Sequence, residues 1–170
     1  KIVSNVYAAR NTISQRMEGP RCSASVTLDL RHMVDGDRCG LAAFNGHSGL
    51  LTIVRDGKSY KLVQSNTLVH LTDREKAITG VDEDVVEQVD LKRCKKIQLR
   101  IDGDFTPGKD IATFYYKIGK GEWTPIGEPF KMQFDYRRLF MGTRYAIFNY
   151  ATKQAGGYVD VDSFDYSREE

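Results

Sequence analysis

The chain has little excess charge and no long run of apolar residues, and each absence excludes a class of function. Its 25 lysines and arginines nearly balance 23 aspartates and glutamates, whereas a nucleic-acid-binding surface needs a clustered basic excess. The short basic run at residues 92–96 is better explained as the solvated start of a strand. No stretch approaches the length of a membrane-spanning helix. We therefore expect neither a nucleic acid nor a membrane as partner.

Cysteine is also scarce, which excludes a disulfide framework and a zinc site. The three residues Cys22, Cys39 and Cys94 cannot all pair, and no Cys-x-x-Cys or Cys/His metal spacing is present. Cys22 shares strand parity with the apolar residues at 24, 26, 28 and 30. We expect it to be a small residue of the core.

Groups that could carry out catalysis are few. No nucleophile elbow accompanies the histidines, and we interpret His32 and His70 as surface residues. Glycoside hydrolysis needs two carboxylates that face each other across a cleft, and most acids here fall in turns. Asp160 and Asp162 lie on one strand face and could hold Ca²⁺ with a backbone carbonyl, although a solvated polar face is the favoured interpretation. We expect this chain alone not to be a catalyst.

Strand signals, in contrast, recur from end to end. Residues 21–31 alternate between apolar and polar, and the dipeptides Asn45-Gly46, Asp56-Gly57 and Asp102-Gly103 mark turns. Further strands are expected at 39–44, 50–55, 59–64, 96–101, 111–118, 123–132, 144–150 and 158–166. Residues 66–88 are polar and charged, and we expect there either an irregular crossing loop or a pair of short edge strands. The spacing predicts an all-β fold, a two-sheet antiparallel β-sandwich of jelly-roll type, with residues 1–170 as a single domain.

Aromatic residues near turns are the remaining chemical clue, because the flat C–H faces of sugars stack on aromatic rings. Phe44, Asn45 and His47 cluster around one turn, and Phe140 precedes Gly142. Both Phe44 and Phe140 could equally lie in the core under the loops. Trp123 follows a hairpin tip, and as the only tryptophan it is more readily explained as a core anchor than as a sugar platform.

Taken in order, several motifs resemble a known kind of domain. The first block comprises RNTISQR at 10–16, GPRCSA at 19–24 and DGDRCGLAA at 35–43. The second is the hairpin with FYY at 114–116 and WTPIG at 123–127. The third comprises LFMGTRYAIFNYATK at 139–153 and AGGYVD at 155–160. Together they resemble the C-terminal concanavalin A-like β-sandwich domain of glycoside hydrolase family 43, whose enzymes are β-xylosidases and α-L-arabinofuranosidases.

The resemblance implies a non-catalytic, ancillary role. In such enzymes the catalytic acids lie on a separate five-bladed β-propeller upstream, and the sandwich packs on it. Some members extend an aromatic loop toward the active site, and by motif position Phe140 matches that role, with the Phe44–His47 turn as second choice. We expect no cofactor. The resemblance makes a structural calcium suitable for such a sandwich, but no motif locates it.

Two functions stay open on these grounds. One is an ancillary domain whose partners are the catalytic propeller of the same polypeptide and a xylo- or arabino-oligosaccharide. The other is an autonomous carbohydrate-binding module for plant cell-wall polysaccharide. An autonomous module needs Trp123, Tyr115 or Tyr136 exposed together, whereas an ancillary domain needs an apolar patch for the propeller. The chain begins without Met, as an excised fragment would. Localisation does not follow from it, although the parent enzyme is expected to be secreted or periplasmic.

Overall fold

Alternation of apolar and polar residues gives eleven strands in the computed structural model, which describes residues 2–9, 11–71, 78–132 and 143–169. β2 (Arg21–Asp29) illustrates the cause. Its residues at 22, 24, 26 and 28 are buried, while the intervening Ser23, Ser25 and Thr27 are partly exposed. A strand presents alternate side chains to opposite faces, so this pattern places one face on a core and the other toward water.

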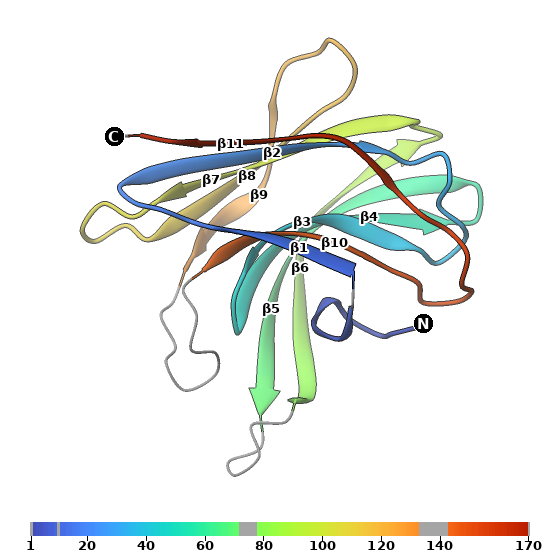
Figure 1. The fold of residues 1–170 in the computed structure, drawn as a ribbon, viewed down its shortest axis with the longest axis horizontal. Helices are drawn as coiled ribbons and strands as arrows, with labels where there is room; N and C mark the ends of the chain where they lie inside the picture. The colour runs from blue at the N-terminus through green and yellow to red at the C-terminus, as the bar shows by residue number, and fades with distance from the viewer. Residues whose placement is uncertain (1, 10, 72–77, 133–142, 170) are drawn as a thin grey trace.

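The strands form two antiparallel sheets (Figure 1). The six-stranded sheet has the order β1 (Asn11–Arg16), β10 (Arg144–Tyr150), β3 (Arg38–Phe44), β4 (His47–Asp56), β5 (Ser59–Leu71) and β6 (Ile78–Lys92). The five-stranded sheet has the order β11 (Asp160–Arg168), β2, β7 (Lys96–Asp104), β8 (Ile111–Lys117) and β9 (Thr124–Lys131). The all-β, two-sheet sandwich expected from the sequence is therefore confirmed.

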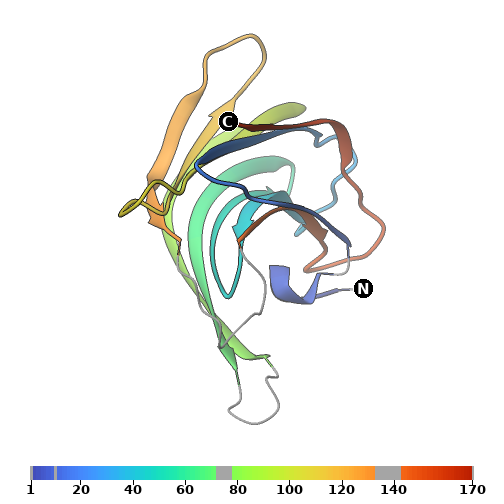
Figure 2. The same ribbon diagram turned by 60° about the vertical axis from the view of Figure 1, so that its left-hand side comes forward.

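The main core lies between the two sheets. β3 packs across from β7, and β9 packs across from β5 and β6 (Figure 2). The inward-facing residues are almost fully buried, among them Leu28, Leu41, Leu51, Leu99 and Phe114. Cys22 belongs to this core, as its parity with the neighbouring apolar residues predicts.

A second, smaller cluster lies on the opposite face of the six-stranded sheet. Here Ala42, Leu50 and Phe148 are buried beneath Val6, which belongs to the short 3₁₀ helix η1 (Val6–Ala8). The segment that leads into the sandwich therefore covers part of the outer face of this sheet (Figure 1). Burial of these side chains ties the N-terminal segment to the fold.

Two expectations from the sequence are wrong in detail. Asp102-Gly103 is not a turn but part of β7, where Gly103 pairs with Cys22 and Ala112. A Cβ at Gly103 would lie 2.6 Å from Met17 Cε, so this glycine allows close packing rather than a change of direction.

Most of residues 66–88 forms long paired strands rather than a crossing loop or short edge strands. β5 and β6 pair antiparallel over their length with three register shifts, and β6 is an edge strand. The charged side chains of β6 face water. The alternation of apolar and polar residues that identifies a half-buried strand is therefore not evident in its sequence. Within the part of the chain that the structure describes, no helix is long and apolar enough to cross a membrane.

Candidate functional site

The turn between β3 and β4 is held together by buried hydrogen bonds. Ser48 Oγ donates to the carbonyl oxygen of Asn45 at 2.6 Å, and the Asn45 backbone N–H donates to Ser48 Oγ at 2.9 Å. The Tyr7 hydroxyl lies 3.0 Å from the Asn45 carbonyl, 2.8 Å from Ser48 Oγ and 2.9 Å from Thr67 Oγ1. Asn45 is only 4% exposed. Its side chain is engaged in the turn, and its contact with a sugar stays a prediction.

The two rings that flank this turn lie in different surroundings. Phe44 packs against Tyr7 on the outer side of the six-stranded sheet, with ring centroids 5.0 Å apart. The His47 ring meets the edge of Phe130 on β9, with centroids 4.7 Å apart. Both side chains are partly buried. The structure does not gather Phe44 and His47 into one binding surface, and a sugar contact at either stays a prediction.

Trp123 lies outside the core, contrary to the interpretation favoured from its being the only tryptophan. It immediately precedes β9 and is partly buried on the outer face of the five-stranded sheet. Lys117 Nζ is 5.1 Å from its ring centroid, and the guanidinium carbon of Arg100 is 5.2 Å from it. Arg100 also lies 4.3 Å from the ring centroid of Tyr115 on β8. Tyr115 and Trp123 thus share one cation at the solvent side of the sheet.

Arg100 is fixed in place by its neighbours on β7 and β2. Its Nε and NH2 groups donate to the two carboxylate oxygens of Asp102 at 2.9 and 2.8 Å. Ser23 donates a third hydrogen bond to Asp102 at 2.6 Å. These contacts with Asp102 raise the pKa of Arg100. The result is a row of aromatic, basic, acidic and hydroxyl groups with their geometry set before any ligand arrives.

Sequence reasoning missed Arg100 and Asp102 as candidate functional residues. Alternation along residues 96–101 does place Arg100 on the solvent face of its strand, but only the pairing of β7 with β8 sets it opposite Tyr115. The signal that could have raised suspicion is the Arg-x-Asp spacing, since residues two apart project from the same face.

Phe140, the first choice for an aromatic loop, lies outside the described residues, as does Tyr136. Its role therefore stays a prediction.

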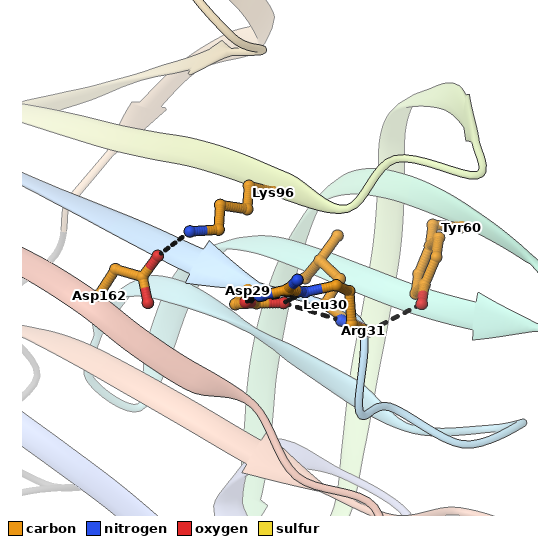
Figure 3. A network of polar contacts seen from close by, with 6 residues as sticks. All are labelled: Asp29, Leu30, Arg31, Tyr60, Lys96 and Asp162. Carbon is orange, nitrogen blue, oxygen red and sulfur yellow. Dashed lines mark hydrogen bonds and ion pairs between the residues drawn. The ribbon is translucent and has the colours of Figure 1, made fainter.

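Asp162, near the start of β11, is engaged in an ion pair. Figure 3 shows Asp162 directed at Lys96, with 2.8 Å between the carboxylate and Nζ. The register shifts between Val161 and Ser163, which interrupts the alternation expected for Asp160 and Asp162. In the same view Asp29 is paired with Arg31, whose hydrogen bonds hold the pKa of Asp29 well below its usual range. Among the described residues, no group of three or more His, Cys, Asp or Glu side chains is arranged to hold a metal ion.

An exposed apolar strip runs along one side of the sandwich, where β1 and β11 are the edge strands of the two sheets. Tyr166 on β11 links these edges, because its ring meets Tyr145 of β10 and its hydroxyl donates to Glu18 just after β1. Ile13 pairs in register with the buried Ile147, so its side chain points toward the space between the sheets. Val161 and Phe164 pair in the same way with Leu28 and Val26. Ile13, Val161 and Phe164 are nevertheless 70%, 42% and 37% exposed.

Comparison with solved structures gives close matches over the whole sandwich. One is described as an engineered GH43 glycoside hydrolase with both endo-xylanase and exo-arabinofuranosidase activity; it is 30% identical, with a TM-score of 0.86 over 98% of this chain. Another is a bifunctional GH43-CE protein from Bacteroides eggerthii, 33% identical, with a TM-score of 0.84 over 100% of this chain. A xylan β-1,4-xylosidase from Bacillus halodurans shares the fold over 97% of this chain at 17% identity and a TM-score of 0.72.

These relatives are much longer than the chain itself. It spans 32%, 20% and 31% of the three solved chains, respectively. Among curated proteins no sequence matches it. A family model described as the β-xylosidase C-terminal concanavalin A-like domain matches residues 3–167. Since this match covers nearly the whole chain and two GH43 enzymes share its fold at 30% identity or more, the chain belongs to the β-xylosidase C-terminal concanavalin A-like domain family.

Proposed function

We propose that this chain is the ancillary, non-catalytic β-sandwich of a xylan- or arabinan-degrading glycoside hydrolase. The observation that carries the proposal is the match of this chain to a C-terminal domain family, together with its length, since it covers only 32% and 20% of the two GH43 chains it resembles. In this proposal the cleavage chemistry belongs to a catalytic propeller upstream. The sandwich packs on that propeller and helps to shape the substrate cleft.

The exposed apolar strip supports such packing. Ile13, Val161 and Phe164 extend the core to the open side of the sandwich and leave apolar surface in water. Exposed apolar side chains of this kind are typical of an interaction site, since their burial against a partner is favourable. We therefore assign the strip to the interface with the catalytic domain.

Calorimetric unfolding of matched variants tests this assignment. Ile13→Lys in the isolated chain should leave the unfolding temperature nearly unchanged, because the side chain is 70% exposed and edge strands tolerate lysine. In the parent enzyme the same substitution places a charge in a buried interface and should lower the unfolding temperature. Ile118→Lys is the control, since Ile118 is 46% exposed and follows β8, away from both edge strands of the strip. Equal unfolding of the Ile13 variant and the parent enzyme would refute the interface.

Phe140 is our proposal for the aromatic side chain that this domain contributes to the substrate cleft. In the same set of parent-enzyme variants, Phe140→Ala should raise KM for xylo- or arabino-oligosaccharides while the unfolding temperature is unchanged. An unchanged KM for both substrates would remove Phe140 from the cleft and leave the packing role standing.

A second candidate function is an autonomous carbohydrate-binding module for plant cell-wall polysaccharide. One observation favours it: Trp123 and Tyr115 lie together on the solvent side of the five-stranded sheet rather than in the core. Sugar rings could stack there while neighbouring polar groups bind their hydroxyls. Titration of the isolated chain with oligosaccharide separates the two functions, because only a module binds sugar without the catalytic domain.

A further inference from the structure

A cleft of about 720 Å³ opens on the outer face of the five-stranded sheet, at one end of β2, β7 and β8. Its polar lining comes from register neighbours: Arg21 pairs with Asp104, and Ser23 pairs with Asp102. Thr113 of β8 is the partner of Asp102 on the other side. None of these residues is explained by packing of the core, because all of them lie on the face that points away from it.

The polar groups of the cleft are held by one another. Asp102 accepts hydrogen bonds from Ser23 and Arg100 at 2.6 to 2.9 Å. Asp104 accepts from the Thr106 hydroxyl at 2.7 Å and from the Thr106 backbone N–H at 3.0 Å, which lowers the pKa of Asp104 to about 2. Asp104 is therefore a stable anion. Arg21 Nε and Lys109 Nζ each lie 3.6 Å from Asp104 Oδ2. Side chains already fixed in this way lose little conformational freedom when they bind a ligand.

The charges of the cleft cancel, which restricts the class of ligand. Three basic side chains, Arg21, Arg100 and Lys109, line it together with three acidic ones, Asp102, Asp104 and Glu169. A site for phosphate, uronate or another anion would present unpaired basic groups instead. Paired acids and bases suit an uncharged ligand with many hydroxyl groups, because each hydroxyl can both donate and accept a hydrogen bond.

Arg100 joins this cleft to the two aromatic rings. It lines the cleft, and its guanidinium carbon lies 4.3 Å from the Tyr115 ring centroid and 5.2 Å from that of Trp123. Along β8, Ile111 and Thr113 line the cleft, Tyr115 is one of the two rings, and Lys117 Nζ lies 5.1 Å from the ring centroid of Trp123. The six residue steps from Ile111 to Lys117 correspond to about 20 Å at about 3.3 Å per residue. The surface is thus an elongated track with an apolar end and a hydrogen-bonding end.

We propose that the Tyr115–Trp123 pair and the cleft form one binding site for an extended chain of uncharged sugars. The rings stack on sugar faces at one end, and Asp102 and Arg100 bind hydroxyl groups at the other. This inference rests on the second candidate function, that of a carbohydrate-binding module, and adds the cleft residues Ser23, Arg100, Asp102 and Thr113 to it. A site of this length binds a long oligosaccharide more tightly than a short one.

The test is calorimetric titration of the isolated chain with xylotriose and xylohexaose. Asp102→Asn keeps the shape of the side chain but removes the anion in the cleft, and Trp123→Ala removes the larger ring. Each should weaken xylohexaose binding at least about tenfold, which corresponds to about 1.4 kcal/mol. Asp56→Asn, in an exposed pair with Lys61, and Tyr158→Ala, an exposed ring elsewhere, are the controls and should bind as the parent chain does. Thr113→Val replaces Asp102→Asn if the latter fails to fold, as judged by circular dichroism.

The outcomes separate this inference from the function on which it rests. Tighter binding of the hexaose than of the triose, with losses in both site variants, supports the site. Loss in Trp123→Ala but not in the cleft variants would confine sugar to the rings and overturn the extended site, while the module function stands. Unaltered binding in both would place the sugar elsewhere and overturn the site. No binding of xylohexaose at millimolar concentration would overturn the site and the module function together.

Discussion

The Tyr7 hydroxyl should be a main anchor of the N-terminal segment, and Tyr7→Phe tests this directly. The substitution keeps the ring, which packs on Phe44 at 5.0 Å, and removes only the oxygen that bonds Asn45, Ser48 and Thr67. Burial of this hydroxyl raises the pKa of Tyr7. The hydroxyl therefore stays neutral, and can donate one hydrogen bond and accept others at neutral pH.

The expected cost follows from the partners that lose a bond. Ser48 Oγ keeps its two bonds to the Asn45 backbone, so the loss falls mainly on Thr67, which is 3% exposed. A hydrogen bond contributes about 0.5–1.5 kcal/mol net, and an unsatisfied buried group costs about 1–3 kcal/mol. We expect Tyr7→Phe to lower the free energy of unfolding by about 2 kcal/mol. In a chain of this size that corresponds to a fall in Tm of about 4–8 °C.

Chemical denaturation of a double-mutant cycle with Thr67→Val is the assay. If the two hydroxyls depend on each other, Thr67→Val should cost about 1 kcal/mol less in the Tyr7→Phe background than alone. Tyr158→Phe, at a ring that is 50% exposed, is the control and should be neutral. A cost below about 0.5 kcal/mol for Tyr7→Phe, or strict additivity with Thr67→Val, would refute the reasoning.

Two further predictions concern the loop around Asp37. Gly157→Ala would bring its Cβ to 2.0 Å from Asp37 Oδ2 and 2.9 Å from the Val34 nitrogen, so the free energy of unfolding measured by thermal unfolding should fall by at least about 1–3 kcal/mol. Gly80→Ala is the control and should have a small effect, because nothing lies within 4 Å of its Cβ. Equal effects of the two substitutions would contradict the steric argument. Burial raises the pKa of Asp37 above its ordinary 3.8. The folded protein therefore binds the proton of Asp37 more tightly than the unfolded chain does. The free energy of unfolding falls as the pH rises from about the ordinary carboxyl pKa through the raised pKa of the folded protein. Asp37→Asn should remove this fall, which a measurement of Tm against pH would detect. Parallel curves for the variant and the parent chain would contradict the prediction.

Local sequence patterns anticipated much of the fold. Alternation over residues 21–31 predicted β2 and its buried face, because a half-buried strand must alternate. Asn45-Gly46 and Asp56-Gly57 marked the turns that join β3 to β4 and β4 to β5. Asp102-Gly103 was wrongly predicted to be a turn, because glycine occurs both in turns and at positions of close packing. Only the contact with Met17 in the folded chain shows that close packing is the reason here.

The candidate surface could be predicted only in part. Trp123 and Tyr115 stood out as aromatics on one hairpin, but the sequence favoured a core position for Trp123. Ser23, Arg100 and Asp102 come from two strands about 80 residues apart, and hydrogen bonding between β2 and β7 unites them. No local pattern encodes that pairing, since it depends on which strands become neighbours in the sheet.

The sequence by itself therefore determined most of the strands, although not β1 or β6, together with most of the turns and the buried side of those strands. These features depend on local backbone preference and on the period of apolar residues. Its motifs also identified the family. Only the tertiary structure decided which polar faces meet. It set Arg100 beside both aromatic rings and joined η1 to the turn between β3 and β4 through the Tyr7 hydrogen bonds. It also left Ile13, Val161 and Phe164 exposed on the two edge strands. These relations arise from contacts between segments far apart in the chain, and their energies depend on the packing of the whole sandwich.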